Sequence, residues 1–176
     1  MRRGCLVDAA CPGCGGRFAD VDGPIHRYMT SSPGCWAAYG VVLAREYETP
    51  ALMPIHRLSV DAYAVQHPGD GSRAAIQSVG LHLARLMVQL ATPQPPAETN
   101  AAMLSFAARK ATLPLLAPPP LFPFTVASVV DALDPAGHAA AVRRWAQSAW
   151  DAWSAHHAFI RDWAGVSTAF LSDVRH

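Results

Sequence analysis

The chain has 176 residues, of which 51% are hydrophobic and 15% charged, and its formal net charge is +1 with histidine neutral. This composition is typical of a globular domain, and it excludes a disordered chain, a basic nucleic-acid-binding surface and an acidic tail. No apolar run reaches the roughly 18 residues that span a membrane, and the N-terminal stretch is too short and interrupted for a signal peptide. We therefore expect one domain in the cytoplasm, where reduced cysteines serve as metal ligands or reactive groups.

Residues 5–32 contain Gly, Pro, Asp and Ser with little periodicity, which predicts a loop that is held by something other than its own core. A helix over residues 33–47 follows. Ser32 is a good N-cap, Pro33 suits the first helical position, and apolar residues then recur at helical spacing.

The next part of the chain predicts a hairpin of two helices. The first helix begins near Pro54 or after Ser59 and ends at the sequence HPG that starts with His67. The second helix has the clearest amphipathic pattern of the chain. Its apolar stripe consists of Ile76, Val79, Leu83, Leu86, Met87 and Leu90.

The second half of the chain is weakly helical over residues 99–112, and the proline-rich residues 113–124 predict an extended cover over the helices. A polyproline motif for a protein partner is the alternative for that segment. A short helix over 125–133 and a long helix over 136–164 follow, and no strand pattern is convincing. The expected fold is mainly α, a single-domain helical bundle with an irregular cysteine-rich N-terminal loop tied down by a metal knuckle. Its parts are residues 1–32, 33–91, 92–124 and 125–176.

The sequence CPGCG, with Cys11 and Cys14, resembles the knuckle of rubredoxin-like and zinc-ribbon sites. A tight turn aims both thiolates at one point, and glycines let backbone amides approach the sulfurs. A thioredoxin-like redox pair would need a preceding strand and a following helix, and neither is expected here. We therefore interpret CPGCG as half of a metal site, with zinc preferred over iron.

A structural zinc site needs four ligands, and the chain has no second CxxC motif. Cys35 is the best third ligand, because the first turn of a helix favours a thiolate. Cys5, near the N-terminus, is a weaker candidate. The fourth ligand is His26 or a histidine from the following helices.

Folding the chain at the turn near Asp70 places His82 level with His56 and Asp61. An aspartate beside a histidine commonly orients a ligand or a base. We expect a polar cleft whose members are His56, Asp61, Tyr63, Gln66, His67, Ser78 and His82. The catalytic candidates among them are His56, Asp61, Tyr63, His67 and His82.

The last helix places His156 inward, between Trp153 and Ile160, with His157 at the edge of that face. An inward histidine needs a partner. It either bonds a backbone carbonyl in the core or forms the far wall of the cleft.

The sequence resembles an uncharacterised bacterial family, a domain of unknown function, over about residues 11–90. The resemblance rests on CPGCGG, DGPIHRYMTSSPGCW, AREY, HRLSVDAYAVQHPG and SVGLHL, while the C-terminal part matches loosely in WAQSAWDAWSAHH. It implies a bacterial protein with a Cys/His-rich signature, and it supplies no reaction, cofactor or substrate.

Three functions follow from these residues. The favoured hypothesis is a small-molecule enzyme in which a zinc ion with three protein ligands activates water for hydrolysis or a related addition. The alternative is a non-catalytic module in which four ligands close a structural zinc site and the protein binds a protein partner or a second copy of itself. The third hypothesis is an enzyme with Cys35 as the nucleophile and a histidine base.

Overall fold

The computed structural model describes residues 8–91 and 96–165, and it is built mainly of helices, which confirms the expected fold class. A two-stranded antiparallel ribbon comes first, with β1 (Asp8–Ala10) paired to β2 (Arg17–Ala19). The helices that follow are α1 (Pro33–Glu48), α2 (His56–Gln66), α3 (Arg73–Ala91), α4 (Pro96–Arg109), α5 (Ala127–Val130), α6 (Pro135–Ala152) and α7 (His157–Ala164). Short 3-10 helices lie at Pro50–Ile55, Lys110–Thr112 and Ser154–His156.

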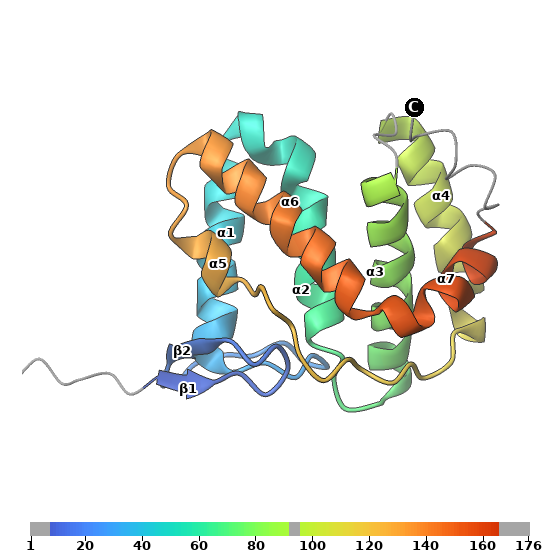
Figure 1. The fold of residues 1–176 in the computed structure, drawn as a ribbon, viewed down its shortest axis with the longest axis horizontal. Helices are drawn as coiled ribbons and strands as arrows, with labels where there is room; N and C mark the ends of the chain where they lie inside the picture. Colours follow the sequence, from blue (N-terminus) through green and yellow to red (C-terminus); the bar gives the residue numbers. More distant parts are fainter. Residues whose placement is uncertain (1–7, 92–95, 166–176) are drawn as a thin grey trace, which may run out of the picture.

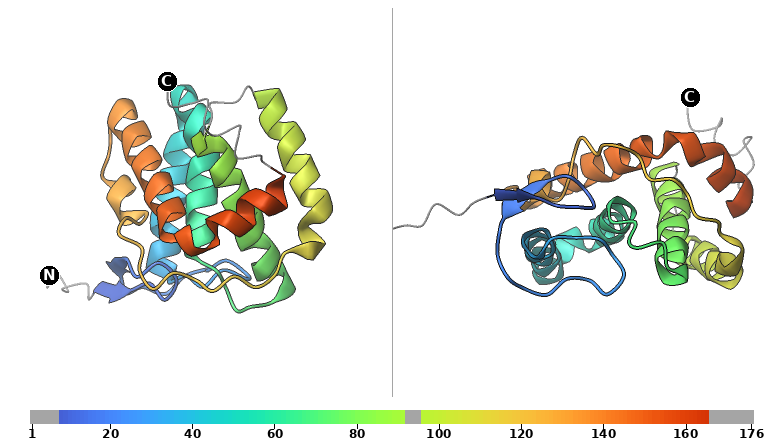
Figure 2. Two further views of the ribbon diagram at one scale, coloured as in Figure 1. Left: turned by 45° about the vertical axis from the view of Figure 1, so that its right-hand side comes forward. Right: turned by 90° about the horizontal axis from the view of Figure 1, so that it is seen from below.

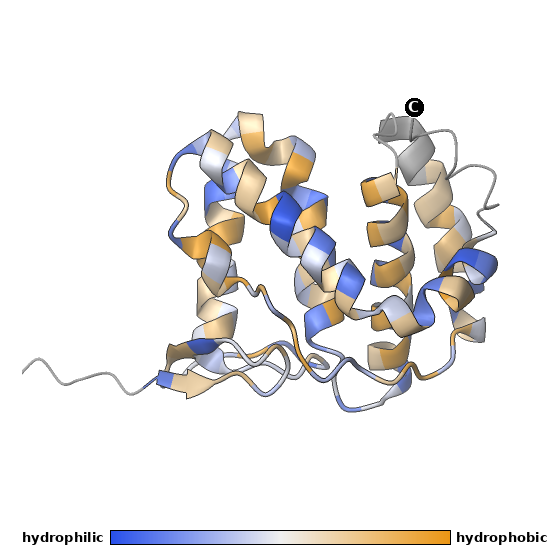
Figure 3. Ribbon diagram, in the orientation of Figure 1, coloured by the Kyte–Doolittle hydropathy of each residue, from blue (hydrophilic) through white to orange (hydrophobic). Residues whose placement is uncertain are grey.

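Helix α2 lies at the centre of the fold. Helices α1 to α4 stand side by side, α6 crosses one face of α2 and α3, and α5 covers α1 (Figures 1 and 2). The side of α6 that faces away from α2 carries hydrophilic residues (Figure 3). Its inner side buries Trp145, and the chain after it buries Trp153 against α2. The ribbon lies at the end of the fold where α1 begins and α2 ends (Figure 1).

The helix expected over residues 33–47 is confirmed as α1, and the local cause is the expected cap. The side chain of Ser32 accepts a hydrogen bond from the amide of Cys35 (3.2 Å), and Pro33 occupies the first helical position. The segment 113–124 contains no helix, as its prolines predicted. Its buried residues Leu113, Leu116 and Phe122 pack it over the helices as an extended cover.

Two expectations about elements were wrong. The strands β1 and β2 were missed because each has three residues, which is too few to show an alternating pattern. The long helix expected over residues 136–164 is interrupted after Ala152. The indole of Trp153 is buried there and donates to the carbonyl of Val65 (3.1 Å), so tertiary packing redirects the chain without a proline or glycine at the break.

Candidate metal centre

The turn between β1 and β2 carries Cys11 and Cys14. The amide of Cys11 donates to the carbonyl of Gly16 (2.8 Å), and the amide of Gly15 donates to the carbonyl of Cys11 (2.9 Å). Gly15 has φ of 74°, in the left-handed region that favours glycine. The closed turn brings the two sulfur atoms within 4.8 Å of each other.

Two helix ends complete the group with Cys35 and His67. Cys35 lies in the first turn of α1, and His67 caps the C-terminal end of α2. Nε2 of His67 is 3.4 Å from Sγ of Cys35 and 3.5 Å from Sγ of Cys11, and Sγ of Cys14 is 3.9 Å from Sγ of Cys35. All four ligand atoms lie within 4.8 Å of one another, so this buried group could bind a metal ion.

Neighbouring groups orient the ligand atoms. Nδ1 of His67 lies 2.7 Å from the carbonyl oxygen of Tyr63. Because a carbonyl only accepts, Nδ1 carries the proton and Nε2 presents its lone pair to the sulfurs. The amide of Ser32 donates to Sγ of Cys11 (3.4 Å), and the hydroxyl of Tyr63 lies 3.6 Å from Sγ of Cys35. These donors can stabilise negative charge on thiolate ligands.

The three thiols are too close to ionise together without a cation. Hydrogen bonds from Cys14 and Cys35 hold the pKa of Cys11 far below its usual range. The hydrogen bond to Cys11 raises the pKa of Cys14 to about 12. Hydrogen bonds to Cys11 and Cys14, together with burial, raise the pKa of Cys35 further. A bound divalent cation would stabilise all three thiolates at once.

The structure places His67, and not His26, beside the cysteines. The ring of His26 packs edge-on against Tyr28, with 4.4 Å between centroids, and lies 5.4 Å from the ring of Trp36. Its Nδ1 accepts from the amide of Tyr28 over 3.5 Å. Cys5 lies outside the described residues.

The residues of the expected polar cleft do not meet in one place, because they bond different partners. His82 bonds Asp61 as the hairpin register predicted, with 2.5 Å between Nδ1 and Oδ1. His56 bonds Glu46 instead, with 2.8 Å between Nδ1 and Oε2. The structure therefore distributes the expected catalytic residues over three places: Tyr63 and His67 at the cysteines, Asp61 and His82 between α2 and α3, and His56 beside α1.

Gln66 and Ser78, the remaining members of that cleft, also have separate environments. The side chain of Gln66 accepts from Nε1 of Trp145 (2.9 Å) and donates to the carbonyl of Phe124 (2.6 Å). The hydroxyl of Ser78 is buried and has no hydrogen-bond partner among the described residues. Gln66 therefore fixes the end of α2 next to His67 and does not line a cleft.

Glu46 is a buried carboxylate that joins α1, α2 and α6. One oxygen accepts from His56, and the other accepts from the hydroxyl of Ser59 and from Nε2 of His138 (3.1 Å). Nη1 of Arg45 lies 3.0 Å from Nδ1 of His138. Since the guanidinium only donates, the proton of His138 is on Nε2, toward Glu46.

Glu46 was not predicted as a site residue, although its position in the helix carries a signal. Glu46 follows Tyr39 by seven residues and Val42 by four, so the three share one helix face, and all three are buried. A carboxylate on an apolar helix face needs donors from neighbouring helices.

His156 and His157 both bond backbone carbonyls. Nε2 of His156 lies 2.9 Å from the carbonyl oxygen of Ala117, and Nε2 of His157 lies 2.9 Å from that of Trp150. The ring of His157 also stacks on Trp150, with 3.8 Å between centroids. Because the helix is interrupted, His156 is half-buried beside the extended cover and forms no cleft wall.

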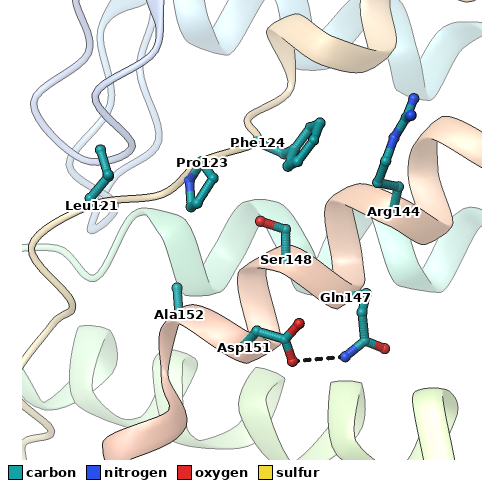
Figure 4. A pocket seen from close by; sticks show the side chains of 8 residues that line it. All are labelled: Leu121, Pro123, Phe124, Arg144, Gln147, Ser148, Asp151 and Ala152. Atoms are coloured by element: carbon teal, nitrogen blue, oxygen red, sulfur yellow. Dashed lines mark hydrogen bonds between the residues drawn. The ribbon is translucent and has the colours of Figure 1, made fainter.

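A separate groove of about 560 Å³ lies between the segment before α5 and the outer side of α6 (Figure 4). Nε2 of Gln147 donates to Asp151 (2.8 Å), and the guanidinium of Arg144 lies 5.4 Å from the centre of the Phe124 ring. The groove is lined by Leu121, Pro123, Phe124, Arg144, Gln147, Ser148, Asp151 and Ala152. It contains no cysteine or histidine, so it is not an extension of the candidate metal centre.

Comparison with known proteins gives a family and no activity. The chain belongs to the family of unknown function DUF5946, which matches residues 9–154 and so includes the four residues of the candidate metal centre. No curated protein and no solved structure matches the chain. In the described part of the chain, no helix has the length and apolar character needed to cross a membrane.

Proposed function

We propose that the protein binds one zinc ion through Cys11, Cys14, Cys35 and His67, and that this ion holds the N-terminal ribbon on the helices. The family of the chain assigns no activity, so the proposal rests on the chemistry of the described residues. The main support for the proposal is the set of distances between the ligand atoms of the Cys3His group.

A tetrahedral zinc ion, with Zn–S near 2.3 Å and Zn–N near 2.0 Å, sets its sulfurs about 3.8 Å apart and a sulfur about 3.5 Å from the nitrogen. The matching distances are 3.9 Å between Cys14 and Cys35, and 3.5 and 3.4 Å from His67 to Cys11 and Cys35. Three thiolates with one imidazole form a common ligand set of structural zinc. Zinc is favoured over iron because iron–sulfur sites commonly use four thiolates.

Four buried ligands favour a structural ion over a catalytic one. Exposure is 2% for Cys11, Cys14 and His67 and 0% for Cys35. A catalytic zinc ion commonly has three protein ligands and keeps its fourth position for water or substrate. The closed group therefore supports the alternative of a structural zinc site over the hypothesis of zinc-activated water.

The same burial weakens the hypothesis that Cys35 is a nucleophile. A reactive cysteine is at least partly accessible and has a lowered pKa. Cys35 has no exposed surface, and hydrogen bonds and burial raise its pKa.

The proposed zinc site would join three parts of the chain. Cys11 and Cys14 come from a ribbon with three-residue strands, Cys35 from the start of α1, and His67 from the end of α2. A ribbon of this size has little stability of its own, and zinc binding contributes directly to folding free energy. The free thiols of Cys11, Cys14 and Cys35 fit a reducing compartment, and we propose the cytoplasm. A protein partner or a second copy of the chain stays a prediction.

Metal analysis of the protein, purified without added metal, tests the proposal. We expect about one zinc ion per chain, because structural sites bind zinc tightly, and less than about a tenth of an equivalent would contradict it. Cys14→Ser and His67→Gln should lose the ion. The matched control His26→Gln should keep it, since His26 lies outside the group. Zinc retained by His67→Gln and lost by His26→Gln would reverse the assignment of the fourth ligand.

A further inference from the structure

A second polar group lies outside the metal centre, where α2 meets α3 at the fully buried carboxylate of Asp61. Nδ1 of His82 lies 2.5 Å from Oδ1 of Asp61. Oδ2 accepts from Nε of Arg85 (3.2 Å) and from Nε2 of Gln89 (2.5 Å). The three donors follow one another along one face of α3, which encloses the carboxylate.

This arrangement fixes the tautomer of His82. A carboxylate only accepts, so Nδ1 of His82 carries the proton and Nε2 carries the lone pair. The side chain of His82 is 17% exposed, and within residues 8–91 and 96–165 its Nε2 has no hydrogen-bond partner. Nε2 can therefore accept a proton from a bound molecule, and the charge of Asp61 would stabilise the imidazolium that forms.

His56 has a similar bond to a carboxylate but different surroundings. Its Nδ1 bonds Glu46, and the same carboxylate also binds His138 and the hydroxyl of Ser59. Glu46 thus serves the contact among three helices, and the ring of Tyr47 lies 4.6 Å from that of His56. His56 is the natural control for His82.

An imidazole and an indole pack together in the loop before α1 and in its first turns. The half-buried ring of Trp36 lies 5.4 Å from the ring of His26. Nδ1 of His26 accepts from the amide of Tyr28, so the proton of neutral His26 is on Nε2. Burial, and then the charge of His82, lower the pKa of His26.

We propose that Asp61 and His82 form a general-base site for a small molecule with an ionisable O–H group, including water. In this step the O–H bond breaks, the proton bonds to Nε2 of His82, and the electron pair stays on the oxygen. His82 is the catalytic residue because it takes the proton. Asp61 is a positioning residue that fixes the imidazole and stabilises its charged form. The site does not depend on the zinc proposal.

The ester 4-nitrophenyl acetate is a suitable probe, because an unprotonated imidazole promotes its hydrolysis. Water adds to the acetyl carbon as Nε2 takes its proton, the C–O bond breaks, and 4-nitrophenolate leaves with acetate as the other product. We expect the full chain to hydrolyse the ester faster than an equal concentration of free imidazole. His82→Gln should lower the protein-dependent rate about a hundredfold, the lower end of general-base effects.

The response to Asp61→Asn separates a catalytic role of the pair from a structural one. In a folded variant the maximal rate should fall while KM stays close to that of the unaltered protein. The reason is that asparagine lacks the charge that stabilises the imidazolium formed in the step.

The control is His56→Gln, which should leave both the maximal rate and KM unchanged. An unchanged rate in folded His82→Gln, or an unchanged maximal rate in folded Asp61→Asn, would overturn the proposal. If either variant fails to fold, as judged by circular dichroism, labelling of the unaltered protein with diethyl pyrocarbonate replaces it. Mass spectrometry should then find His82 modified before the fully buried His138, and protection of His82 would overturn the proposal.

Discussion

Replacing Gly13 with alanine tests the packing of the CPGCG turn against the end of α2. A Cβ atom at this position would lie 2.2 Å from the carbonyl oxygen of Thr30 and 2.6 Å from Cδ2 of His67. It would also lie 3.0 Å from the carbonyl oxygen of Gln66. Two of these neighbours are backbone atoms, which cannot rotate away, and the third belongs to a candidate ligand.

The size of the effect follows from these contacts. Overpacking a well-packed site costs about 1–3 kcal/mol, and the short distance to Thr30 places Gly13→Ala at the upper end. Moving His67 aside would relieve the clash but would weaken the metal centre. Gly40→Ala is the matched control, because Gly40 is exposed in α1 and its added Cβ would meet nothing within 4 Å. We expect it to stabilise the protein by about 0.5–1 kcal/mol through helix propensity.

Urea unfolding of the zinc-loaded protein, followed by far-ultraviolet circular dichroism, measures both variants. Competition with a chelator gives their relative zinc affinities. We expect a lower unfolding midpoint and weaker zinc retention for Gly13→Ala alone. A midpoint equal to that of the unaltered protein would refute the packing of the turn against Thr30 and His67.

Three further substitutions test the buried polar contacts. Glu46→Gln should lower the free energy of unfolding by about 1–3 kcal/mol, because it turns a buried N–H group toward hydrogen-bond donors. The control Glu48→Gln, at an exposed position, should change the free energy of unfolding little. Equal urea midpoints of the two variants would contradict this prediction. Trp145→Phe should lower the free energy of unfolding by about 1–3 kcal/mol, because it leaves the side-chain oxygen of Gln66 without its hydrogen-bond donor. An unchanged urea midpoint would show that this hydrogen bond adds no stability. Burial lowers the pKa of His157 in the folded protein below its usual value of 6.5. The neutral form of His157 therefore stabilises the fold above pH 6.5, and this stability is lost as the pH falls through the lower pKa of the folded protein. The unfolding free energy of the unaltered protein minus that of His157→Gln should therefore decrease between about pH 7.5 and about pH 5.5, and a constant difference would exclude this contribution.

The position of Cys35 could be predicted from the sequence because its signal is local. Ser32 and Pro33 define where α1 begins, and the cap bond from Cys35 to Ser32 follows from that start. The bond between Asp61 and His82 was also predictable, since a short turn between two helices fixes which residues lie level.

The choice of His67 over His26 could not be made in this way. His26 lies between the cysteines in the sequence, but the path of an aperiodic loop has no local signal. The end of α2 is placed by Trp145, which bonds Gln66 from a helix that lies 79 residues further along the chain. Such a contact is set by the packing of the whole fold.

Helix α2 links the two proposed sites and also explains why they can be separated. Its C-terminal end supplies His67 to the cysteines, whereas Asp61, about two turns earlier, accepts hydrogen bonds from His82, Arg85 and Gln89 of α3. Loss of zinc removes the metal bonds that link the ribbon and α1 to the end of α2, but it removes none of these hydrogen bonds to Asp61. A zinc-free variant that keeps its helices should therefore retain the ester hydrolysis that depends on His82. Loss of this hydrolysis in such a variant would mean that the zinc site also holds the Asp61–His82 site in place.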